Sequence, residues 1–595
     1  MSAVSNDPSP LVRGRAAEAL GLIGEASAAP PIGVLVSGVV ASGALANIQP
    51  DESGSPLAPE VEAFRLGLYA LVRLKATDVL LPAILDADGK PKSSWWPVAF
   101  ALRRAQPPQS SDASASAPAS PLDPRTLPAL QVLLKGDGFY SASFAAQGLG
   151  LSKKPEVAVP ALLEVLTSPT PRAAVRLQAV RGLGRLGDPR AIAPLIALLD
   201  EPTVEPNLQL EIVNALGALK ATAAIERLLD RLADPWPAMR AATVTALAAI
   251  DGENFLQVLS GIDPDPDWTV RTAVVNALAT LGDAVPDAAW KPYLEDADRR
   301  TWPATMRALA AAKTPEAKAS AEQLIKARLT HEDAIVRATA AGLVAETKLA
   351  DGPAILAAAW QAAKNDPEID AKVSILEALI ALKAPQAPAL LAEALGDREW
   401  AVRLKARAML KTLDAASTAQ VTRPAVIRLD LPVYAALGSP TVSPRAYIDT
   451  SKGAIEIALN VVDAPMTSHN FRTLAERGFF NGVRIHRVVP DFVVQDGDPR
   501  GDGNGGPGYA IRDELNDLPY LRGTVGMALD GPDTGGSQWF ITHSPQPHLD
   551  AKYTVFGQVV AGMDVVDKLQ QDDTIIRIRI WDGGAQPAAP TAAPR

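Results

Sequence analysis

Two neighbouring stretches of the 595-residue chain say most about its fold. The first reads Arg484-Ile-His-Arg-Val-Val-Pro-Asp-Phe-Val-Val-Gln-Asp-Gly-Asp498, and the second reads Met527-Ala-Leu-Asp-Gly-Pro-Asp-Thr-Gly-Gly-Ser-Gln-Trp-Phe-Ile541. A third, shorter stretch follows as His548-Leu-Asp-Ala-Lys-Tyr-Thr-Val-Phe-Gly557. Short apolar and β-branched runs bounded by Gly, Pro and Asp are typical of strands. This part of the chain is therefore predicted to form a β-sheet domain.

The strand pattern begins near Arg445 and extends beyond the quoted stretches. Residues 446–459 alternate around a Ser-Lys-Gly turn and predict a β-hairpin. A helix is expected over residues 464–477, closed by Gly478. Further strands are predicted at 483–489, 492–495, 523–529, 538–542, 553–560 and 575–581, with a second helix near 563–570.

The quoted stretches resemble the signature core of the cyclophilins, a family of peptidyl-prolyl cis-trans isomerases. The resemblance covers about a quarter of the chain. It implies a cyclophilin-like eight-stranded antiparallel β-barrel with two helices, and an enzyme that isomerises Xaa-Pro bonds in proline-containing polypeptide clients. This chemistry needs no cofactor, nucleophile or metal, because the barrier of about 18–20 kcal/mol arises from amide resonance.

The resemblance assigns a role to each residue that matches the family's motif. Arg487 takes the place of the catalytic arginine, whose charged, planar guanidinium is suited to donate a hydrogen bond to the proline nitrogen. Gln495 and Gln538 fall where the family orients this arginine and the substrate backbone. The pocket that grips the proline ring is implied to consist of Phe492, Val493, Phe540 and Leu549.

Five further positions are implied to contact the substrate, and three of them depart from the family's commoner residues. Gly503 lies in the glycine-rich loop, and Ala528 lies on a strand beside the peptide. Leu529 replaces a frequent Asn whose backbone contacts the substrate, so that contact survives the change. His548 replaces a frequent Trp and Tyr553 a frequent His. Both changes resemble the bacterial branch, and neither removes the arginine or the pocket.

The segment Gly501-Asp-Gly-Asn-Gly-Gly506 also matches the GxGxxG pattern of dinucleotide-binding proteins. That interpretation is disfavoured because Asp496, Asp498 and Asp502 would repel phosphate and no long helix follows. A calcium loop is disfavoured because the twelfth-position Glu is missing. The preferred interpretation is a glycine loop that lets the backbone approach a peptide.

Residues 1–415 have a different pattern, a series of helices rich in Ala and Leu. Leu183, Leu216, Leu247 and Leu278 end successive apolar helices at intervals of 33, 31 and 31 residues. Such a period is typical of a solenoid of helix pairs. The recurring Asp-x-x-x-x-Val-Arg-x-x-Ala motif resembles short, bacterial HEAT repeats. It implies an all-α HEAT-repeat solenoid that serves as a protein-binding scaffold.

The arginine of this motif recurs with the period of the solenoid. It stands at positions Arg176, Arg240, Arg271, Arg337 and Arg403. Because it repeats, we expect it to pair with an Asp of its own or a neighbouring turn rather than to bind a ligand. No catalytic constellation is visible among these repeats.

Composition argues against several other functions. A formal net charge of -10 disfavours nucleic acid and anionic membranes as partners. The chain has no Cys, which removes disulfides, thiolate nucleophiles and Cys-based metal sites, and its five His show no ligand spacing, so no metal site is expected. No secretory signal is visible at the N-terminus, which favours the cytoplasm, while the periplasm stays open.

The predicted domain division follows the changes in composition. It consists of the solenoid over 1–415 with a Pro- and Ser-rich loop at 106–127, a linker over 416–443, the sheet domain over 444–584 and a disordered tail over 585–595. Two functions follow. The first is an active prolyl isomerase whose solenoid recruits protein clients; the second is a non-catalytic scaffold that binds proline-containing peptides. The intact motif around Arg487 favours the first.

Overall fold

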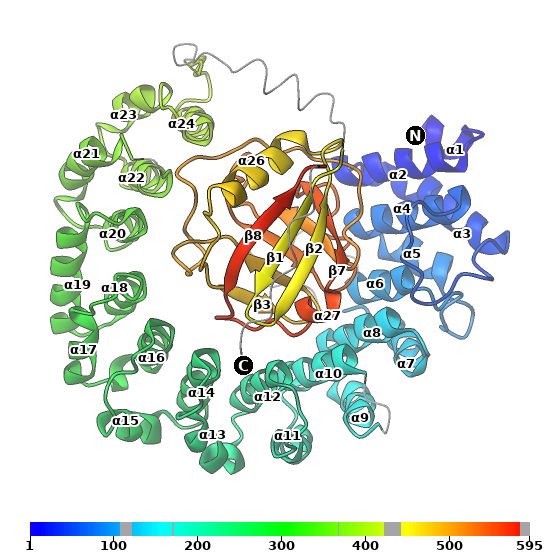
Figure 1. Cartoon of the computed structure of the whole chain (residues 1–595), viewed down its shortest axis with the longest axis horizontal. Coiled ribbons are helices and arrows are strands. Elements are labelled where there is room, and N and C mark those ends of the chain that lie inside the picture. Colours follow the sequence, from blue (N-terminus) through cyan, green and yellow to red (C-terminus); the bar gives the residue numbers. More distant parts are fainter. Residues whose placement is uncertain (107–121, 169–171, 367, 422–441, 584–595) are drawn as a thin grey trace. The chain divides into compact units, whose positions relative to one another are not determined.

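The computed structural model describes residues 1–106, 122–168, 172–366, 368–421 and 442–583. The chain divides into two compact units, Met1–Leu228 and Leu229–Arg595. The first unit is helical, and the second contains helices followed by a sheet domain (Figure 1). Within the described residues, no helix is both long and apolar enough to cross a membrane.

The first unit is a stack of helix pairs. Helices α2 and α4 pack together, as do α6 and α8, α8 and α10, and α10 and α12. Several of these helices begin with Pro, whose fixed φ and missing N–H suit the first helical position. The helices are α1 (Ser2–Asn6), α2 (Pro10–Ile23), α3 (Ala29–Ala41), α4 (Pro59–Arg73), α5 (Thr77–Ile84), α6 (Trp96–Arg104), α7 (Leu127–Lys135), α8 (Phe139–Leu151), α9 (Pro155–Leu166), α10 (Ala173–Leu186), α11 (Ile192–Leu199) and α12 (Pro206–Ala218), with α13 (Ile225–Arg231) at the boundary.

The second unit continues the same helical pattern in what we call the second-unit array, helices α14 to α24. The even-numbered helices pack in succession, α14 on α16, α16 on α18 and so on to α24. The bounds are α14 (Pro237–Ile250), α15 (Gly252–Ser260), α16 (Trp268–Leu281), α17 (Lys291–Leu294), α18 (Trp302–Ala311), α19 (Pro315–Arg328), α20 (Ala334–Glu346), α21 (Gly352–Ala363), α22 (Asp370–Ala381), α23 (Ala387–Ala394) and α24 (Trp400–Leu413).

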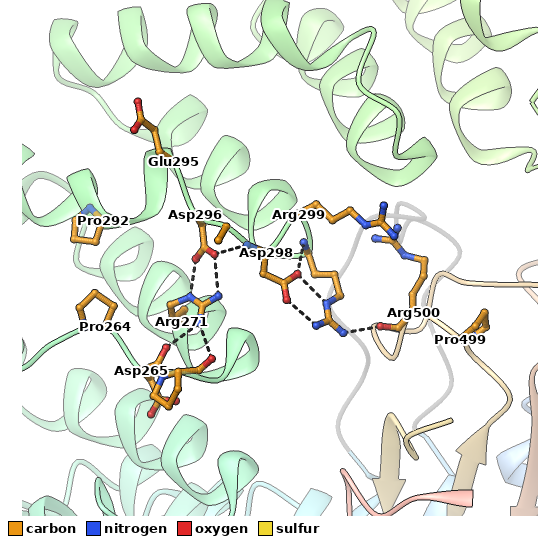
Figure 2. Close-up of a pocket in the computed structure, with 13 residues that line it drawn as sticks. Pro264, Asp265, Arg271, Pro292, Glu295, Asp296, Asp298, Arg299, Pro499 and Arg500 are labelled. Atoms are coloured by element: carbon orange, nitrogen blue, oxygen red, sulfur yellow. Dashed lines mark hydrogen bonds and ion pairs between the residues drawn. The ribbon is translucent and has the colours of Figure 1, made fainter. Parts of the chain in front are cut away.

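Three of the five recurring arginines pair with an Asp along the stack, as the sequence predicts, whereas Arg176 approaches Glu201 and Arg403 donates to backbone carbonyl oxygens. The Arg240 side chain bonds both oxygens of Asp265, at 2.7 and 2.8 Å. Arg271 bonds both oxygens of Asp296 at the same distances, and it also donates to the carbonyl oxygen of Asp265 at 2.8 Å (Figure 2). Arg337 pairs with one oxygen of Asp366 through its Nη2 atom. These arginines therefore connect one turn of the stack to the next.

The sheet domain consists of eight antiparallel strands in the order β3-β4-β6-β5-β7-β2-β1-β8. The strands are β1 (Arg445–Thr450), β2 (Gly453–Leu459), β3 (Arg487–Val489), β4 (Val493–Asp496), β5 (Thr524–Met527), β6 (Trp539–Thr542), β7 (Val555–Ala561) and β8 (Ile575–Trp581). The sheet curls (Figure 1), and a bridge between Arg484 and Thr574 joins its two edges. The predicted eight-stranded antiparallel fold is confirmed.

The interior of the barrel is filled by aromatic and branched side chains. Phe471 on α26 (Pro465–Glu476) contacts the rings of Phe480, Trp539 and Phe556 at centroid distances of 5.3, 5.7 and 5.4 Å. The second helix is α27 (Met563–Val566). Both predicted helices are therefore present, although α27 is shorter than the sequence suggested.

Some predicted boundaries differ from the structure. The strand expected at 483–489 is reduced to β3, because Val483 and Ile485 bond instead to residues 572–575, which include the first residue of β8. The end of the loop expected at 106–127 is helical, since Asp123 caps a short 3₁₀ turn at Pro124–Thr126. Most of that loop, residues 422–441 of the expected linker and the expected tail lie outside the described residues. The domain boundaries remain predictions.

Candidate active site

A strand hairpin brings the predicted catalytic arginine against a glutamine. Arg487 on β3 lies opposite Gln495 on β4, and its Nη1 atom donates a hydrogen bond to Gln495 Oε1 at 3.2 Å. The guanidinium carbon lies 5.7 Å from the centroid of the Phe492 ring. Loss of hydration lowers the pKa of Arg487, but an arginine stays charged at neutral pH. A charged group with several donors is thus held beside an aromatic ring.

A second glutamine continues this contact toward the glycine-rich loop, residues 498–508. Gln495 Nε2 donates a hydrogen bond to Gln538 Oε1 at 3.0 Å. Gln538 Nε2 donates in turn to the carbonyl oxygens of Gly503 and Gly505, at 2.8 and 2.9 Å. One hydrogen-bonded chain therefore links the loop to Arg487, and a shift of the loop would change the position of the arginine.

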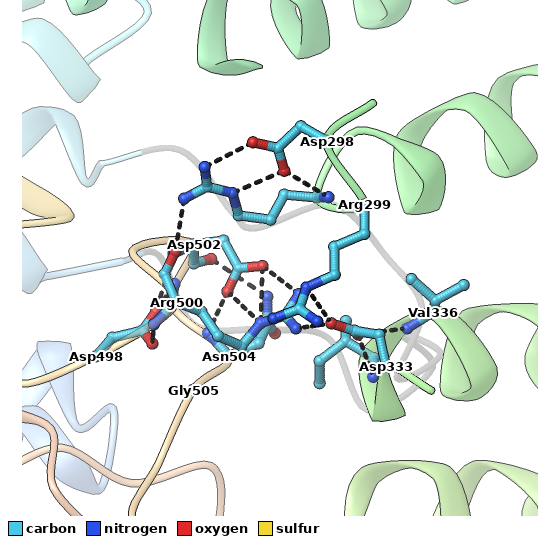
Figure 3. A network of polar contacts seen from close by, with 12 residues as sticks. Asp298, Arg299, Asp333, Val336, Asp498, Arg500, Asp502, Asn504 and Gly505 are labelled. Carbon is cyan, nitrogen blue, oxygen red and sulfur yellow. Dashed lines mark hydrogen bonds and ion pairs between the residues drawn. The ribbon is translucent and has the colours of Figure 1, made fainter. Parts of the chain in front are cut away.

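The glycine-rich loop is wound around one buried carboxylate. Asp498 is 1% exposed, and its oxygens accept hydrogen bonds from the backbone N–H groups of Arg500, Asp502 and Gly503 at 2.7, 2.9 and 2.5 Å (Figure 3). A Cβ atom at position 505 would lie 2.0 Å from Asp498 Oδ1, so Gly505 permits this close approach.

The anchoring role of Asp498 was not predicted from the sequence, where this residue was interpreted as a charge that repels phosphate or as part of a disfavoured calcium loop. Asp side chains commonly bond the backbone two residues further on, and the contact from Asp498 to the N–H of Arg500 has this form. The Asp-Pro-Arg-Gly sequence therefore contained a local signal for the turn.

The predicted proline pocket forms a separate apolar cluster in the sheet domain. Its buried members are Val493, Tyr520, Phe540, Leu549 and Val555, and its partly buried members are Phe492, Leu518, Ala528 and Tyr553. Six of the residues predicted for the site meet in this cluster. The partly exposed members leave apolar surface open to a ligand.

Two residues were not predicted, namely Tyr520, which is a buried member of the cluster, and Gly526, which packs against it. The ring of Tyr520 stacks on Phe540 with a centroid distance of 5.5 Å, and Tyr520 is 1% exposed. Burial raises the pKa of Tyr520 well above its usual value. A Cβ atom at Gly526 would lie 2.3 Å from the Tyr520 hydroxyl and 2.6 Å from Phe540 Cζ. A glycine inside an expected strand is the signal that indicated such close packing.

Two predicted residues outside the cluster, His548 and Leu529, lie around it or behind it, while Tyr553 is one of its partly buried members. The His548 ring stacks on Phe492 at 5.6 Å, and the Tyr553 ring meets the Phe540 ring edge-on at 5.9 Å. Leu529 differs, because its side chain packs against the barrel interior. Its backbone is therefore the part that remains for a peptide contact.

A buried acid next to the site has an unusual environment. Asp496 follows Gln495 on β4, is 1% exposed, and accepts a hydrogen bond from the Gly497 N–H at 2.6 Å. Its Oδ2 atom has no hydrogen-bond partner among the described residues. Burial, with a smaller effect of nearby Asp498, raises the pKa of Asp496 to about 8. This carboxyl group is therefore mostly protonated at neutral pH.

The described parts of the chain contain no group of three or more His, Asp or Glu side chains placed to hold a metal ion. The site itself presents Arg487, the two glutamines, the glycine-rich loop and the apolar cluster.

Comparison with known proteins identifies the family. Residues 445–580 match the family described as cyclophilin type peptidyl-prolyl cis-trans isomerase/CLD. A peptidyl-prolyl cis-trans isomerase of Synechococcus elongatus is 47% identical over 138 residues, which are 23% of this chain and 95% of that relative. The chain belongs to the cyclophilin-type peptidyl-prolyl cis-trans isomerases. The predicted family is confirmed, and residues 445–581 are hereafter the cyclophilin domain.

A second relative agrees with this assignment, and the helices match a different family. Peptidyl-prolyl cis-trans isomerase B of Bacillus subtilis is 45% identical over 128 residues, 21% of this chain and 90% of that protein. A crystal structure of a cyclophilin type isomerase of Cryptosporidium parvum is 29% identical, covers 24% of this chain and 100% of that chain, and has a TM-score of 0.23. Residues 126–206 and 204–279 match HEAT repeats, which confirms the predicted repeat type.

Proposed function

We propose that Arg487 and the apolar cluster beside it, together called the substrate groove, are where this isomerase acts on Xaa-Pro bonds of polypeptide clients. The observation that carries the proposal is the arginine itself, bonded to Gln495 and lying 5.7 Å from the Phe492 ring centroid, beside an apolar cluster that contains Val493 and Phe540. The cluster would hold the proline ring while the guanidinium faces the bond that rotates.

The chemistry follows from the electronic structure of the amide. In the planar ground state the nitrogen lone pair is delocalised into the carbonyl group and is a poor hydrogen-bond acceptor. When the bond twists, the nitrogen becomes pyramidal and its lone pair accepts a hydrogen bond from Arg487. Because this bond is stronger in the transition state than in the ground state, it accelerates rotation rather than merely improving binding.

The other predicted residues would position the substrate. Leu549 would complete the wall around the proline ring, with His548 and Tyr553 at its rim. Gln538 and Gly503 would hold the polypeptide backbone on the side of the glycine-rich loop, beside Ala528 and the backbone of Leu529. A substrate fixed on both sides of the bond can rotate only about the Xaa-Pro bond itself.

The helical repeats of both units, which form the predicted HEAT solenoid, would serve as a protein-binding scaffold. HEAT repeats expose long, repeated surfaces to partners, and residues 126–279 match this repeat type. A client or complex bound to the array would raise the local concentration of proline segments near the cyclophilin domain. Such a partner would be recognised by its direct binding to the helical repeats.

The direct test is NMR exchange spectroscopy on an Ala-Pro tetrapeptide with the full-length protein. Arg487→Ala should lower kcat/KM by about 100- to 1000-fold, which corresponds to ~2.7–4 kcal/mol, the usual loss for one transition-state donor. The matched control is Arg477→Ala, an exposed arginine at the end of α26, which should retain full activity.

The same experiment separates the two functions that the sequence left open. If the wild-type protein binds the peptide but does not raise the exchange rate, the non-catalytic scaffold is the correct function. If Arg487→Ala exchanges the peptide as fast as the wild type, the assignment of the site is wrong.

A further inference from the structure

The glycine-rich loop is attached to the second-unit array, which belongs to the same compact unit. Arg500 in the loop pairs with Asp502 at 2.7 Å and also with Asp333 of the array (Figure 3). The Asp333 side chain is 1% exposed, caps the first turn of α20 and also pairs with Arg299 at 3.0 Å. The pairing of Arg500 with a buried array carboxylate therefore fixes the loop against the array.

Contacts from two other array turns hold the same region. Arg300 Nη1 donates a hydrogen bond to the carbonyl oxygen of Arg500 at 2.7 Å. Further along the chain, the guanidinium carbon of Arg512 lies 4.7 Å from the centroid of the Trp400 ring. Three separate turns of the array thus contact the segment that begins at the glycine-rich loop.

Between these contacts lies a cavity of about 430 Å³ that the array and the cyclophilin domain line together. Its lining on the cyclophilin side includes Gln495, Ala528 and Gln538. On the array side it includes Glu368, Ile369 and Asp370, at the beginning of α22. Ala528 also packs in the apolar cluster. A peptide whose proline occupies that cluster therefore has a continuous path into the cavity.

The lining of the cavity is acidic. It contains Glu368, Asp370 and Asp530, and no Lys or Arg is among its described lining residues. Burial raises the pKa of Glu368, and the neighbouring charge of Asp370 raises it further. Burial likewise raises the pKa of Asp370, with an added effect of Asp530, while Lys405 and Arg500 oppose it. These carboxylates are incompletely compensated, so a cation in the cavity would be bound favourably.

We propose that Glu368, Ile369 and Asp370 of the array form one wall of the substrate groove and select proline segments with a Lys or Arg within a few residues of the proline. The proposal rests on the assignment of the groove around Arg487. Ile369 offers apolar surface to the stem of the cationic side chain, and the two carboxylates bind its charged end. Because the array bounds the groove, the preferred substrate is an extended segment.

The test uses the full-length protein and peptides in which Lys or norleucine stands at each position flanking Ala-Pro. Norleucine keeps an aliphatic stem but removes the charge. At one flanking position, kcat/KM should be about tenfold higher for Lys than for norleucine, equivalent to ~1.4 kcal/mol. In the Glu368→Gln/Asp370→Asn double variant this ratio should fall to within about twofold of one, because the acceptors have lost their charge.

The matched control is Glu377→Gln, an exposed carboxylate on the same helix α22, which should keep the wild-type ratio. The proposal is overturned if Lys and norleucine peptides react alike at every position, or if the preference survives in the double variant. Circular dichroism melting of the double variant shows whether the fold is kept.

Peptide dissociation constants from NMR titration separate this proposal from the catalytic assignment. The preference for Lys over norleucine should appear in the dissociation constants of the wild type and of Arg487→Ala alike, because the wall does not depend on turnover. Equal dissociation constants for the two peptides would contradict the proposal that the array wall selects a cationic side chain. Retained turnover in Arg487→Ala would instead contradict only the assignment of the catalytic arginine.

Discussion

Arginines in the second-unit array and in the cyclophilin domain do opposite things with the same functional group. Arg240 and Arg271 each bond both oxygens of an Asp on the following turn of the stack. Arg487 instead bonds the neutral amide of Gln495. The charge and the donors of the array arginines are paired with carboxylates of the protein itself. The amide of Gln495 does not neutralise Arg487, so its charge and its other donors can act on a ligand.

The partner of an arginine is therefore more informative than its exposure. Arg271 is partly buried with a buried Asp296 and belongs to a series that repeats along the array. Arg487 belongs to no series and lies between an amide and an aromatic ring. This difference predicts that changes at the paired array arginines act on stability, and that changes at Arg487 act on catalysis.

The largest effect should come from breaking a buried array pair. Arg271→Ala leaves Asp296, whose side chain is 2% exposed, without its bidentate partner. The free energy of unfolding of the second unit should fall by about 3–5 kcal/mol, the usual result of leaving one charge of a buried pair uncompensated. Urea denaturation followed by tryptophan fluorescence measures it.

The control for that measurement is Lys326→Ala, which removes a surface cation paired with Glu322 and Asp351. Its effect should stay below about 1 kcal/mol, since exposed pairs contribute little. Equal losses for Arg271→Ala and Lys326→Ala would mean that the repeated arginines do not stabilise the stack.

A smaller effect should come from the buried acid that lacks a cation. The pKa of Asp496 is raised to about 8 in the folded protein from an ordinary value of 3.8. The unfolded chain therefore loses this proton at lower pH than the folded chain, and stability should decrease as the pH rises from about 4 to 8. Asp496→Asn should remove most of this decrease, about 2–4 kcal/mol between pH 5 and pH 8.

Unfolding free energies at pH 5 and pH 8 test this prediction. The exposed Asp564→Asn on α27 serves as the control and should leave the pH dependence as it is in the wild type. If the unfolding free energy of Asp496→Asn depends on pH as strongly as that of the wild type, burial does not raise the pKa of Asp496.

The smallest effect should come from the link between array and loop. Asp333→Asn weakens the pairing with Arg500, and the loop is connected through Gln538 and Gln495 to Arg487. We expect kcat to fall about three- to tenfold with a smaller change in KM, as for other couplings transmitted through packed networks. Asp333 would then be a positioning residue.

The effect of Asp333→Asn is measured by determining kcat and KM separately on the tetrapeptide. The control is Asp351→Asn, which changes an array carboxylate whose side chain is 48% exposed. Partial recovery of kcat in Asp333→Glu would support a positioning role. An unchanged kcat in Asp333→Asn would show that the array does not influence the arginine.

Much of the fold could be predicted because its signals are local. The Ser-Lys-Gly turn of the β1–β2 hairpin and the span of β8 were read directly from alternating residues, and the structure agrees. Strand β3 was predicted too long, because backbone bonds of Val483 and Ile485 to the distant segment 572–575 replace a ladder within the sheet. Such partners have no signature in the local pattern.

The site shows the same division between local and distant information. The resemblance indicated six members of the apolar cluster, but the position of Tyr520 behind Phe540 follows from packing across the barrel. The pairing of Asp333 with Arg500 joins residues 167 positions apart. In the sequence, Asp333 is one more acidic residue of a repeat, and nothing nearby marks its partner.

The central claim is that the two kinds of arginine divide stability from catalysis, and a crossed measurement on Arg487→Ala and Arg271→Ala tests it most directly. Both the exchange rate of the Ala-Pro peptide and the unfolding free energy are measured for each variant at a temperature where both are folded. We predict a loss of about 100- to 1000-fold in kcat/KM with little change in unfolding free energy for Arg487→Ala, and a loss of about 3–5 kcal/mol of stability with most of the activity retained for Arg271→Ala. Full activity in Arg487→Ala, or a loss of stability in Arg487→Ala as large as in Arg271→Ala, would contradict the claim.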